Sequence, residues 1–192
     1  MRAAGNPDIS QSAVRTALRQ AEAAEDDVDF TEFTPASEID FDAEDSYYTA
    51  WYGDPDPPYD ADTIVIDGTA EESLSVYRFW DSSTGPGHEA GPWTADAADI
   101  DRLRSQSDAA SEVIIDRYSL PGDADRVTKF DVDAGTNVRI SEVGPNYGGD
   151  GGGTQYEIRG DDMRKDTDQI DVSDMPVHKQ SETSITEFLN TE

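Results

Sequence analysis

The chain has 192 residues, with 43 Asp and Glu against 14 Lys and Arg, which gives a formal net charge of -29 and an isoelectric point near 4.1. This balance lacks the basic patch of a nucleic-acid-binding protein, and the absence of cysteine excludes disulfides and thiolate metal sites. No apolar run approaches the roughly 18 residues of a membrane helix, and the N-terminus lacks an apolar signal core, so we expect a soluble protein.

The acidic residues are spread over the whole length, and only three basic residues are lysine: Lys129, Lys165 and Lys179. Concentrated cations screen the repulsion within such a surface, so we interpret the charge as adaptation to high salt. The expected location is the cytoplasm of a halophilic host, or a virion. A nucleic-acid mimic or immunity-type inhibitor is an alternative that depends on charge alone.

Residues 1–24 are predicted to form a docking helix capped by Ser10 or Ser12. Its narrow apolar stripe comprises Ala13, Val14, Ala17, Leu18, Ala21 and Ala24. Residues 25–62 are acidic, contain four prolines and carry scattered aromatic residues, so we interpret them as an irregular arm that follows the surface or docks a partner.

Residues 63–160 are predicted to be the core domain. Alternating and β-branched runs predict strands in TIVIDG, SLSVYRFW, EVIIDRYSLP, RVTKFDV, NVRISEV and TQYEIRG, and ADAADIDRLRSQ predicts a helix capped by Thr94. Residues 161–192 read as a polar tail that ends in a helical turn at SITEFL. The predicted fold is α+β, a small mixed or antiparallel sheet of about five or six strands with one or two helices and irregular extensions at both ends.

Most familiar catalytic and metal motifs are absent from the chain. The two histidines, His88 and His178, have no metal spacing, and there is no nucleophile elbow, P-loop or dinucleotide fingerprint. Asp131, Asp133 and Glu142 stand at calcium-loop positions, but Thr136 occupies the place where such a loop needs glycine. We therefore predict neither a metal nor a bound cofactor.

A different pattern runs from about Val76 to Ile158. It consists of a Tyr-Arg strand, the turn GPWT, the strand end SLP, the pair DAGTNVRISEVGP and the run GGGTQY. In this pattern the chain resembles the C-terminal domains of bacterial polymorphic toxins, and within them the tuberculosis necrotizing toxin family of NAD glycohydrolases, which are distant structural relatives of the ADP-ribosyltransferases.

The resemblance implies hydrolysis of NAD as substrate, with Arg78 and Gln155 as the catalytic pair. Arg78 would hold the phosphates and Gln155 would lie beside the nicotinamide ribose. The expected NAD-binding residues are Trp93, Thr94, Gly151, Gly152, Gly153 and Tyr156: Trp93 or Tyr156 would stack on the nicotinamide, and the glycines would let backbone N–H groups approach the ligand. This interpretation requires Arg78 and Gln155 to line one cleft.

Each of these features also has a purely structural interpretation. Arg78 could pair with a surface carboxylate, Gln155 could be an ordinary strand residue, and the glycines could form a long hairpin loop. The alternative function is a non-enzymatic assembly protein of a halophilic virus. The expected partners are accordingly NAD, an immunity protein, or neighbouring virion subunits held by the terminal segments.

Overall fold

The computed structural model describes residues 10–24, 26–39, 59–60, 62–84, 93–106, 110–120, 122–159 and 176–190. Its centre is one eight-stranded sheet in the order β1-β2-β6-β7-β4-β3-β5-β8, in which every neighbouring pair is antiparallel. The strands are β1 (Val28–Pro35), β2 (Ile64–Ala70), β3 (Leu74–Trp80), β4 (Trp93–Asp96), β5 (Arg126–Val132), β6 (Asn137–Glu142), β7 (Thr154–Arg159) and β8 (Val177–Ser184).

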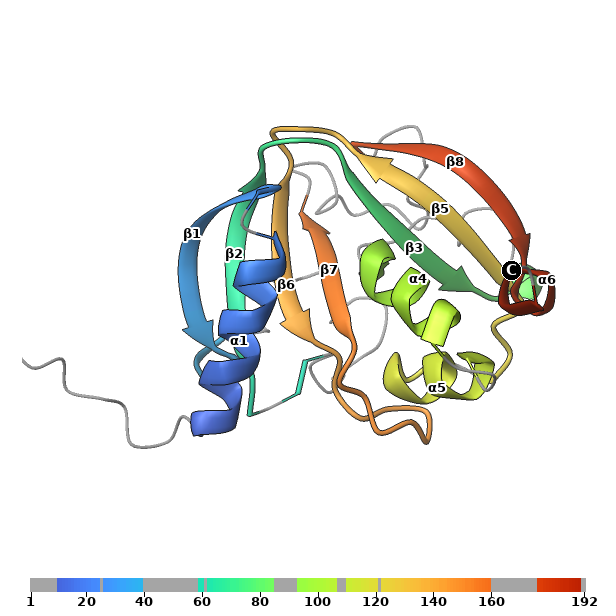
Figure 1. Cartoon of the computed structure of the whole chain (residues 1–192), viewed down its shortest axis with the longest axis horizontal. Coiled ribbons are helices and arrows are strands. Elements are labelled where there is room, and N and C mark those ends of the chain that lie inside the picture. The colour runs from blue at the N-terminus through green and yellow to red at the C-terminus, as the bar shows by residue number, and fades with distance from the viewer. Residues whose placement is uncertain are drawn as a thin grey trace, which may run out of the picture.

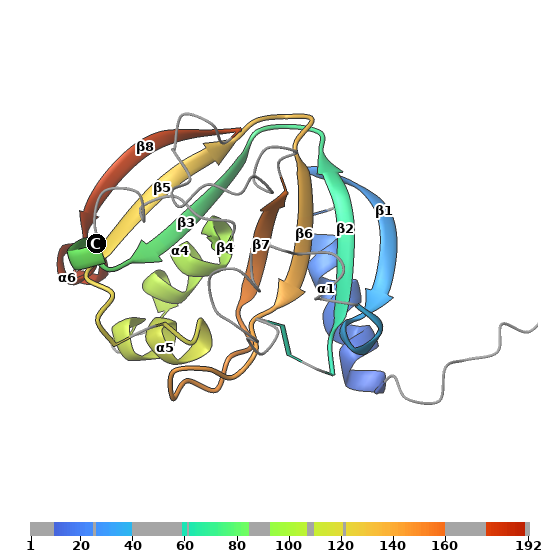
Figure 2. The same cartoon turned by 180° about the vertical axis from the view of Figure 1, so that it is seen from behind.

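Four α-helices lie within the described residues: α1 (Gln11–Ala24), α4 (Ala97–Gln106), α5 (Ala110–Arg117) and α6 (Ile185–Asn190). Helix α1 lies along β2 and β6, whereas α4 lies beside β3 and β4 (Figure 1). The sheet is strongly twisted, so β3, β5 and β8 run obliquely to β2, β6 and β7 (Figure 2). The α+β class predicted from the sequence is therefore confirmed.

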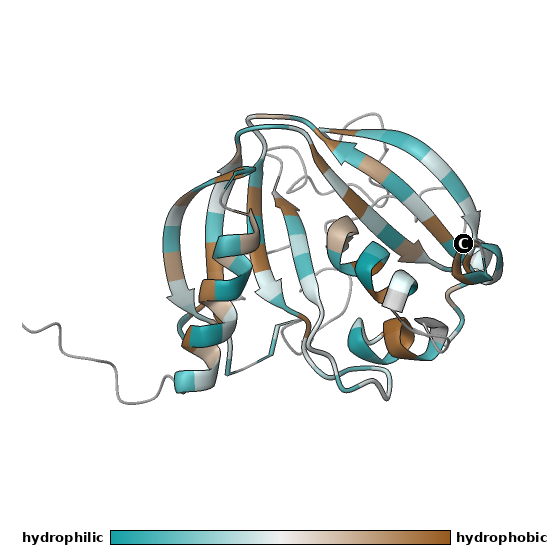
Figure 3. Cartoon of the chain, in the orientation of Figure 1, coloured by the Kyte–Doolittle hydropathy of each residue, from teal (hydrophilic) through white to brown (hydrophobic). Residues whose placement is uncertain are grey.

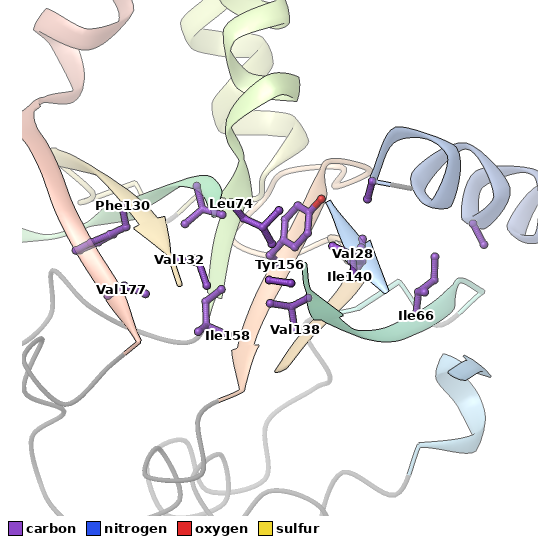
Figure 4. Packing of buried hydrophobic residues seen from close by; sticks show 14 residues of the cluster. Val28, Ile66, Leu74, Phe130, Val132, Val138, Ile140, Tyr156, Ile158 and Val177 are labelled. Atoms are coloured by element: carbon purple, nitrogen blue, oxygen red, sulfur yellow. The ribbon is translucent and has the colours of Figure 1, made fainter. Parts of the chain in front are cut away.

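Side chains of the sheet alternate between two hydrophobic cores. The first core contains Val76, Phe130, Ile140 and Tyr156 together with alanines of α1, and the close view shows Tyr156 beside Leu74 (Figure 4). The second core comprises Tyr77, Phe79, Ala95, Ala97, Ile100, Ile114, Tyr118, Val127, Val143 and Phe188. Neighbouring residues of β3 thus serve different cores, as the period of two in a strand requires.

Several predicted elements are confirmed. The runs TIVIDG, SLSVYRFW, RVTKFDV, NVRISEV and TQYEIRG lie at β2, β3, β5, β6 and β7, and SITEFL ends in α6. Helix α1 begins as predicted, because the Ser10 hydroxyl accepts a hydrogen bond from the Ala13 N–H at 3.0 Å. Its buried stripe is narrower than predicted, because Val14 and Leu18 are exposed.

The run EVIIDRYSLP was predicted to be a strand, and this is wrong. Residues 110–117 form α5, which buries Ile114 and leaves Val113 and Ile115 at the surface. A short apolar run of this kind fits a strand or one face of a helix equally well. Helix α4 is also capped differently from the prediction: Asp96, rather than Thr94, accepts hydrogen bonds from the N–H groups of Ala98 and Asp99.

The predicted strand count is too low because both edge strands lie in segments that we interpreted as irregular. Strand β1 falls within residues 25–62 and pairs with β2, and β8 falls within residues 161–192 and pairs with β5. Strand β8 is largely hydrophilic along its length (Figure 3), which explains why its sequence gives no strand signal. None of the helices in the described part of the chain is long and apolar enough to span a membrane.

Candidate functional site

The predicted site residues come from β3, β4 and β7, which are neighbours in the sheet. Strand β4 joins β3 through only two registered pairs, Val76 with Asp96 and Tyr77 with Ala95. On its other side β4 pairs with β7, where Trp93, Thr94 and Ala95 lie opposite Glu157, Tyr156 and Gln155. Residues 78–80, 93–95 and 155–157 are therefore brought close together by the sheet.

Arg78 lies one residue beyond the last registered pair of β3 with β4. Its side chain is half-buried, and Nη1 donates a hydrogen bond of 2.8 Å to the backbone carbonyl of Trp93. The guanidinium therefore reaches the first residue of β4 at the point where the two strands cease to pair. Its contact with this main-chain carbonyl is of the kind that fixes the end of a strand.

Gln155 is buried in the middle of β7, with 6% of its surface exposed. Its Nε2 donates a hydrogen bond of 2.9 Å to the hydroxyl of Ser141, the residue opposite it on β6. The amide is thereby held in one orientation. A buried amide that is fixed in this way presents a preorganised dipole to whatever lies beside it.

Arg78 and Gln155 nevertheless leave the sheet on opposite faces. Gln155 lies in register with Ala95 and Tyr77, both of which belong to the second core. Arg78 follows Tyr77 directly in β3, so its side chain lies on the opposite face, which is that of the first core. On this same face its register partner on β5, Thr128, accepts a hydrogen bond from the indole N–H of Trp80. The expectation that Arg78 and Gln155 line one cleft is therefore wrong. They approach each other only around Trp93, whose carbonyl contacts Arg78 and whose side chain shares the Gln155 face.

Thr94 and Tyr156 lie on the face opposite Gln155. The Thr94 hydroxyl donates to the Tyr156 carbonyl at 2.8 Å, and both side chains are buried. Burial raises the pKa of Tyr156 well above its ordinary value, with smaller contributions from the charges of Asp96 and Asp27. Because Tyr156 packs within the first core, Trp93 is the better placed of the two aromatic residues suggested for ring stacking.

The glycine run forms the loop between β6 and β7 and lies beside α5 (Figure 1). The N–H groups of Gly151, Gly152 and Gly153 donate to the carbonyls of Asp116, Val143 and Arg117, respectively. All three amides are thus used within the chain. The glycines have a packing role of their own, and the predicted contact with a dinucleotide stays a prediction.

Gly153 shows most clearly why the loop requires glycine. A Cβ atom at this position would lie 2.8 Å from carbons of the Tyr118 ring. The ring cannot move aside easily, because the Tyr118 hydroxyl donates a 2.6 Å hydrogen bond to Asp99, a buried carboxylate at the start of α4. Burial and the Asp99 charge raise the pKa of Tyr118, which keeps the hydroxyl protonated as a donor.

On the Gln155 face, Trp93 belongs to a row whose other members the sequence did not identify as functional. Asp67, Arg139, Glu157 and Trp93 lie directly opposite one another across β2, β6, β7 and β4, and Tyr59 covers them. The only signal in the sequence is the spacing Gln155-x-Glu157, which puts both side chains on one face of a strand. Tyr59 itself carries no such signal, because it follows a segment rich in proline and aspartate.

Hydrogen bonds link the polar members of this row, and the Trp93 ring meets the ring of Tyr59. Arg139 forms a bidentate pair with Asp67 at 2.7 and 2.9 Å, and the Tyr59 hydroxyl donates to Glu157 at 2.6 Å. Burial alone would lower the pKa of Arg139, but its hydrogen bond to Asp67 raises it. Burial and the negative charge of Glu157 raise the pKa of Tyr59, and Arg139 partly offsets this. The Arg139 cation and a protonated Tyr59 are therefore the favoured states.

The described residues contain no group of three or more His, Asp or Glu side chains arranged to hold a metal ion. His88 lies outside the described part of the chain, and His178 pairs with Asp133 on an exposed surface of β8. Within that part, the chemistry available near Trp93 is consequently that of a guanidinium, amides, a carboxylate and aromatic rings.

Comparison with known proteins yields one distant structural neighbour. No family model matches the chain, and no curated protein matches it. Among solved structures it is similar to Tne2 in complex with Tni2, with a TM-score of 0.40 and 16% sequence identity over 62% of this chain and 91% of that one. Similarity at this level does not assign a family or an activity.

Proposed function

We propose that the chain is an NAD glycohydrolase-like domain, adapted to high salt, which hydrolyses NAD to nicotinamide and ADP-ribose around Trp93. The sequence resemblance from Val76 to Ile158 motivates the substrate. The observation that carries the proposal is the position of Trp93: Arg78 bonds its carbonyl, and its side chain lies on the face of Gln155 and Glu157. Residues far apart in the sequence thus meet at the first residue of one short strand.

The reaction breaks the bond between the ribose C1′ and the nicotinamide nitrogen. The bonding electrons leave with nicotinamide, which departs as a neutral molecule, so no acid is needed to protonate it. The ribosyl group gains oxocarbenium character, a water oxygen bonds to C1′, and the water proton is released to solvent. Electrostatic support and a positioned water are sufficient for such a step.

In this proposal each residue near Trp93 has a limited role. The Arg78 guanidinium lies on the face opposite Gln155, so the two side chains do not act from one cleft. Arg78 holds the carbonyl of Trp93, and its fork of N–H donors binds the pyrophosphate where the ligand passes the end of β4. The Gln155 amide, which Ser141 holds in place, orients the ribose and its attacking water. The half-buried Trp93 ring packs on the nicotinamide. A cationic side chain at this point also offsets the repulsion that a dinucleotide meets on a protein of charge -29.

The test is nicotinamide release from NAD in molar KCl by the folded protein. We expect turnover, and we expect Arg78→Ala and Gln155→Ala each to lower kcat/KM at least about a hundredfold, or roughly 2.7 kcal/mol. Arg15→Ala is the matched control for Arg78, because Arg15 lies on the exposed side of α1.

The resemblance also implies an immunity protein as partner, and this remains a prediction.

A non-enzymatic assembly role is the second candidate, and one observation favours it. Three large apolar side chains are exposed near the β1 edge of the molecule: Val14 and Leu18 on α1, and Phe33 on β1. Such residues would suit contact with neighbouring subunits of a virion. If the folded protein releases no nicotinamide, and instead forms a stable complex that buries these residues, the assembly role replaces the enzymatic one.

A further inference from the structure

The row formed by Asp67, Arg139, Glu157 and Trp93, together with Tyr59, is hereafter called the Tyr59 row. We propose that it positions the Trp93 ring for recognition of the nicotinamide group, so that Tyr59 is a positioning residue that sets affinity for this half of the ligand. The inference rests on the proposed function, because it assigns the nicotinamide to Trp93.

The first argument is the graded burial of the row. Arg139, Glu157 and Tyr59 have exposed fractions of 4%, 3% and 4%, whereas Trp93 is only half-buried. Trp93 and Asp67, at the two ends of the row, are the members that are partly accessible, and Trp93 is the one that offers an aromatic ring to a ligand. Tyr59 contacts this ring and Glu157 lies opposite it in the sheet, and both are buried.

The second argument is the way in which Tyr59 is held. Its hydroxyl donates to Glu157 at 2.6 Å and accepts a hydrogen bond from Arg139, which Asp67 fixes through the bidentate pair. The Tyr59 ring then meets the Trp93 ring edge to face, with centroids 5.7 Å apart and an interplanar angle of 68°. Arg78 fixes the backbone of Trp93 through its carbonyl, and the contact with Tyr59 restricts rotation of the indole ring.

The third argument concerns the free-energy cost of burying ionisable groups. Burying three ionisable groups in the sheet brings little net stability compared with apolar residues of the same size. Such networks are better explained by the geometry that they enforce, and here the geometry enforced is that of Trp93. A mobile aromatic ring loses conformational entropy when it binds a planar group, and a ring that is already fixed loses less. Holding the Trp93 ring in place before binding therefore raises the affinity for such a group.

The experiment measures binding of nicotinamide and of ADP-ribose separately, by ligand-observed NMR titration in molar KCl. For Tyr59→Leu we expect the Kd for nicotinamide and the KM for NAD to rise roughly three- to tenfold, the range for loss of one aromatic contact. We expect the Kd for ADP-ribose, which lacks the ring, and kcat to change less than about twofold. Phe33→Leu, at an exposed ring on β1, is the matched control and should change none of these values.

Glu157→Gln is the second variant and keeps the proposal testable if Tyr59→Leu does not fold. It preserves an acceptor for the Tyr59 hydroxyl but removes the charge, so we expect the same selective loss of nicotinamide affinity at a smaller size. Equal weakening of nicotinamide and ADP-ribose, or no change in either, would overturn the inference. Selective loss of nicotinamide affinity in a protein that does not turn over NAD would instead support the inference and refute the glycohydrolase activity.

Discussion

At the scale of single residues, the glycine run illustrates how a motif can have a structural cause that its sequence does not reveal. Six glycines between Gly144 and Gly153 look like a ligand-binding loop, yet the amides of the last three bond to the protein's own carbonyls. Gly149 and Gly151 also approach main-chain oxygens so closely that a Cβ would lie within 2.5 Å of them. The loop is shaped to fit the end of α5.

Gly153→Ala should therefore destabilise the protein. The added methyl group would meet the buried Tyr118 ring, which Asp99 holds, and we expect a loss of about 1 to 3 kcal/mol in the free energy of unfolding. Urea denaturation in molar KCl measures it. Gly122→Ala is the matched control, because a Cβ there meets nothing within 4 Å, and the two variants should differ clearly. Equal stability of both would mean that Tyr118 moves aside freely.

Tyrosine ionisation gives a second prediction for individual side chains. Burial, the charge of Asp101 and a hydrogen bond to it raise the pKa of Tyr77 to about 12, whereas in the unfolded chain the value is near 10. The folded state thus favours the neutral phenol. The stability that follows is complete below pH 10 and is lost as the pH rises toward 12, at up to about 1.4 kcal/mol per pH unit for each such group.

Unfolding by urea at a series of pH values from 8 to about 12 tests this behaviour. The wild-type protein should lose stability above pH 10, and Tyr77→Phe should show a shallower loss because one titrating group has been removed. Tyr147→Phe is the control, since Tyr147 is exposed. If Tyr77→Phe follows the wild-type curve at every pH, Tyr77 ionises equally readily in both states.

At the scale of elements, α1 buries its small residues and exposes its larger ones. Ala17 and Ala24 face the first core and Ala13 is also buried, whereas Val14 and Leu18 lie at the surface. The helix backbone can therefore approach β2 and β6 closely, which a stripe of larger side chains would prevent.

Ala17→Leu should consequently destabilise the protein by about 1 to 3 kcal/mol, because there is no room for a larger side chain at this position. Leu18→Ala, at the next position, should change the stability by less than about 0.5 kcal/mol. Thermal unfolding of both variants in the same buffer provides the comparison. A larger loss for Leu18→Ala than for Ala17→Leu would show that a partner or another part of the chain covers Leu18.

Strands could be predicted from the sequence where the local pattern of apolar residues matches the burial of those residues in the fold. SLSVYRFW and RVTKFDV correctly predict strands β3 and β5, whose buried residues are mostly β-branched or aromatic. The two edge strands escaped prediction because pairing on one side requires little apolar surface, as the exposed residues of β8 show. Strand β4 escaped because four residues are too few for a period to appear.

The candidate site was predictable only in part, for a related reason. Arg78, Trp93 and Gln155 could be identified through the resemblance, but their strand pairing and faces depend on a register that the sequence does not contain. Tyr59 and Arg139 could not be identified, because their proximity to Glu157 is created by the pairing of β6 with β7 and by the chain that crosses the sheet before β2.

At the scale of the whole molecule, a net charge of -29 places mutual repulsion among the carboxylates of the folded chain. The Debye length grows from about 3 Å at 1 M salt to about 10 Å at 0.1 M, so repulsion among the carboxylates increases as salt is removed. Few lysines and arginines are available to offset it.

We therefore expect the melting temperature to fall by roughly 10 °C when KCl is lowered from about 2 M to 0.1 M, which corresponds to about 3 kcal/mol for a chain of this size. Differential scanning calorimetry measures the change. Sucrose added at low salt, which favours the compact state without screening charge, should restore only part of the loss. An unchanged melting temperature across this range would refute the interpretation of the charge as adaptation to salt.

The central claim is that the residues around Trp93 form an NAD-cleaving site, and the most direct measurement is nicotinamide release by the purified, folded protein in molar KCl. The account predicts release above the uncatalysed blank, with losses of at least about a hundredfold for Arg78→Ala and Gln155→Ala and none for Arg15→Ala. Release no faster than the blank, from protein shown to be folded by its cooperative unfolding transition, would contradict it.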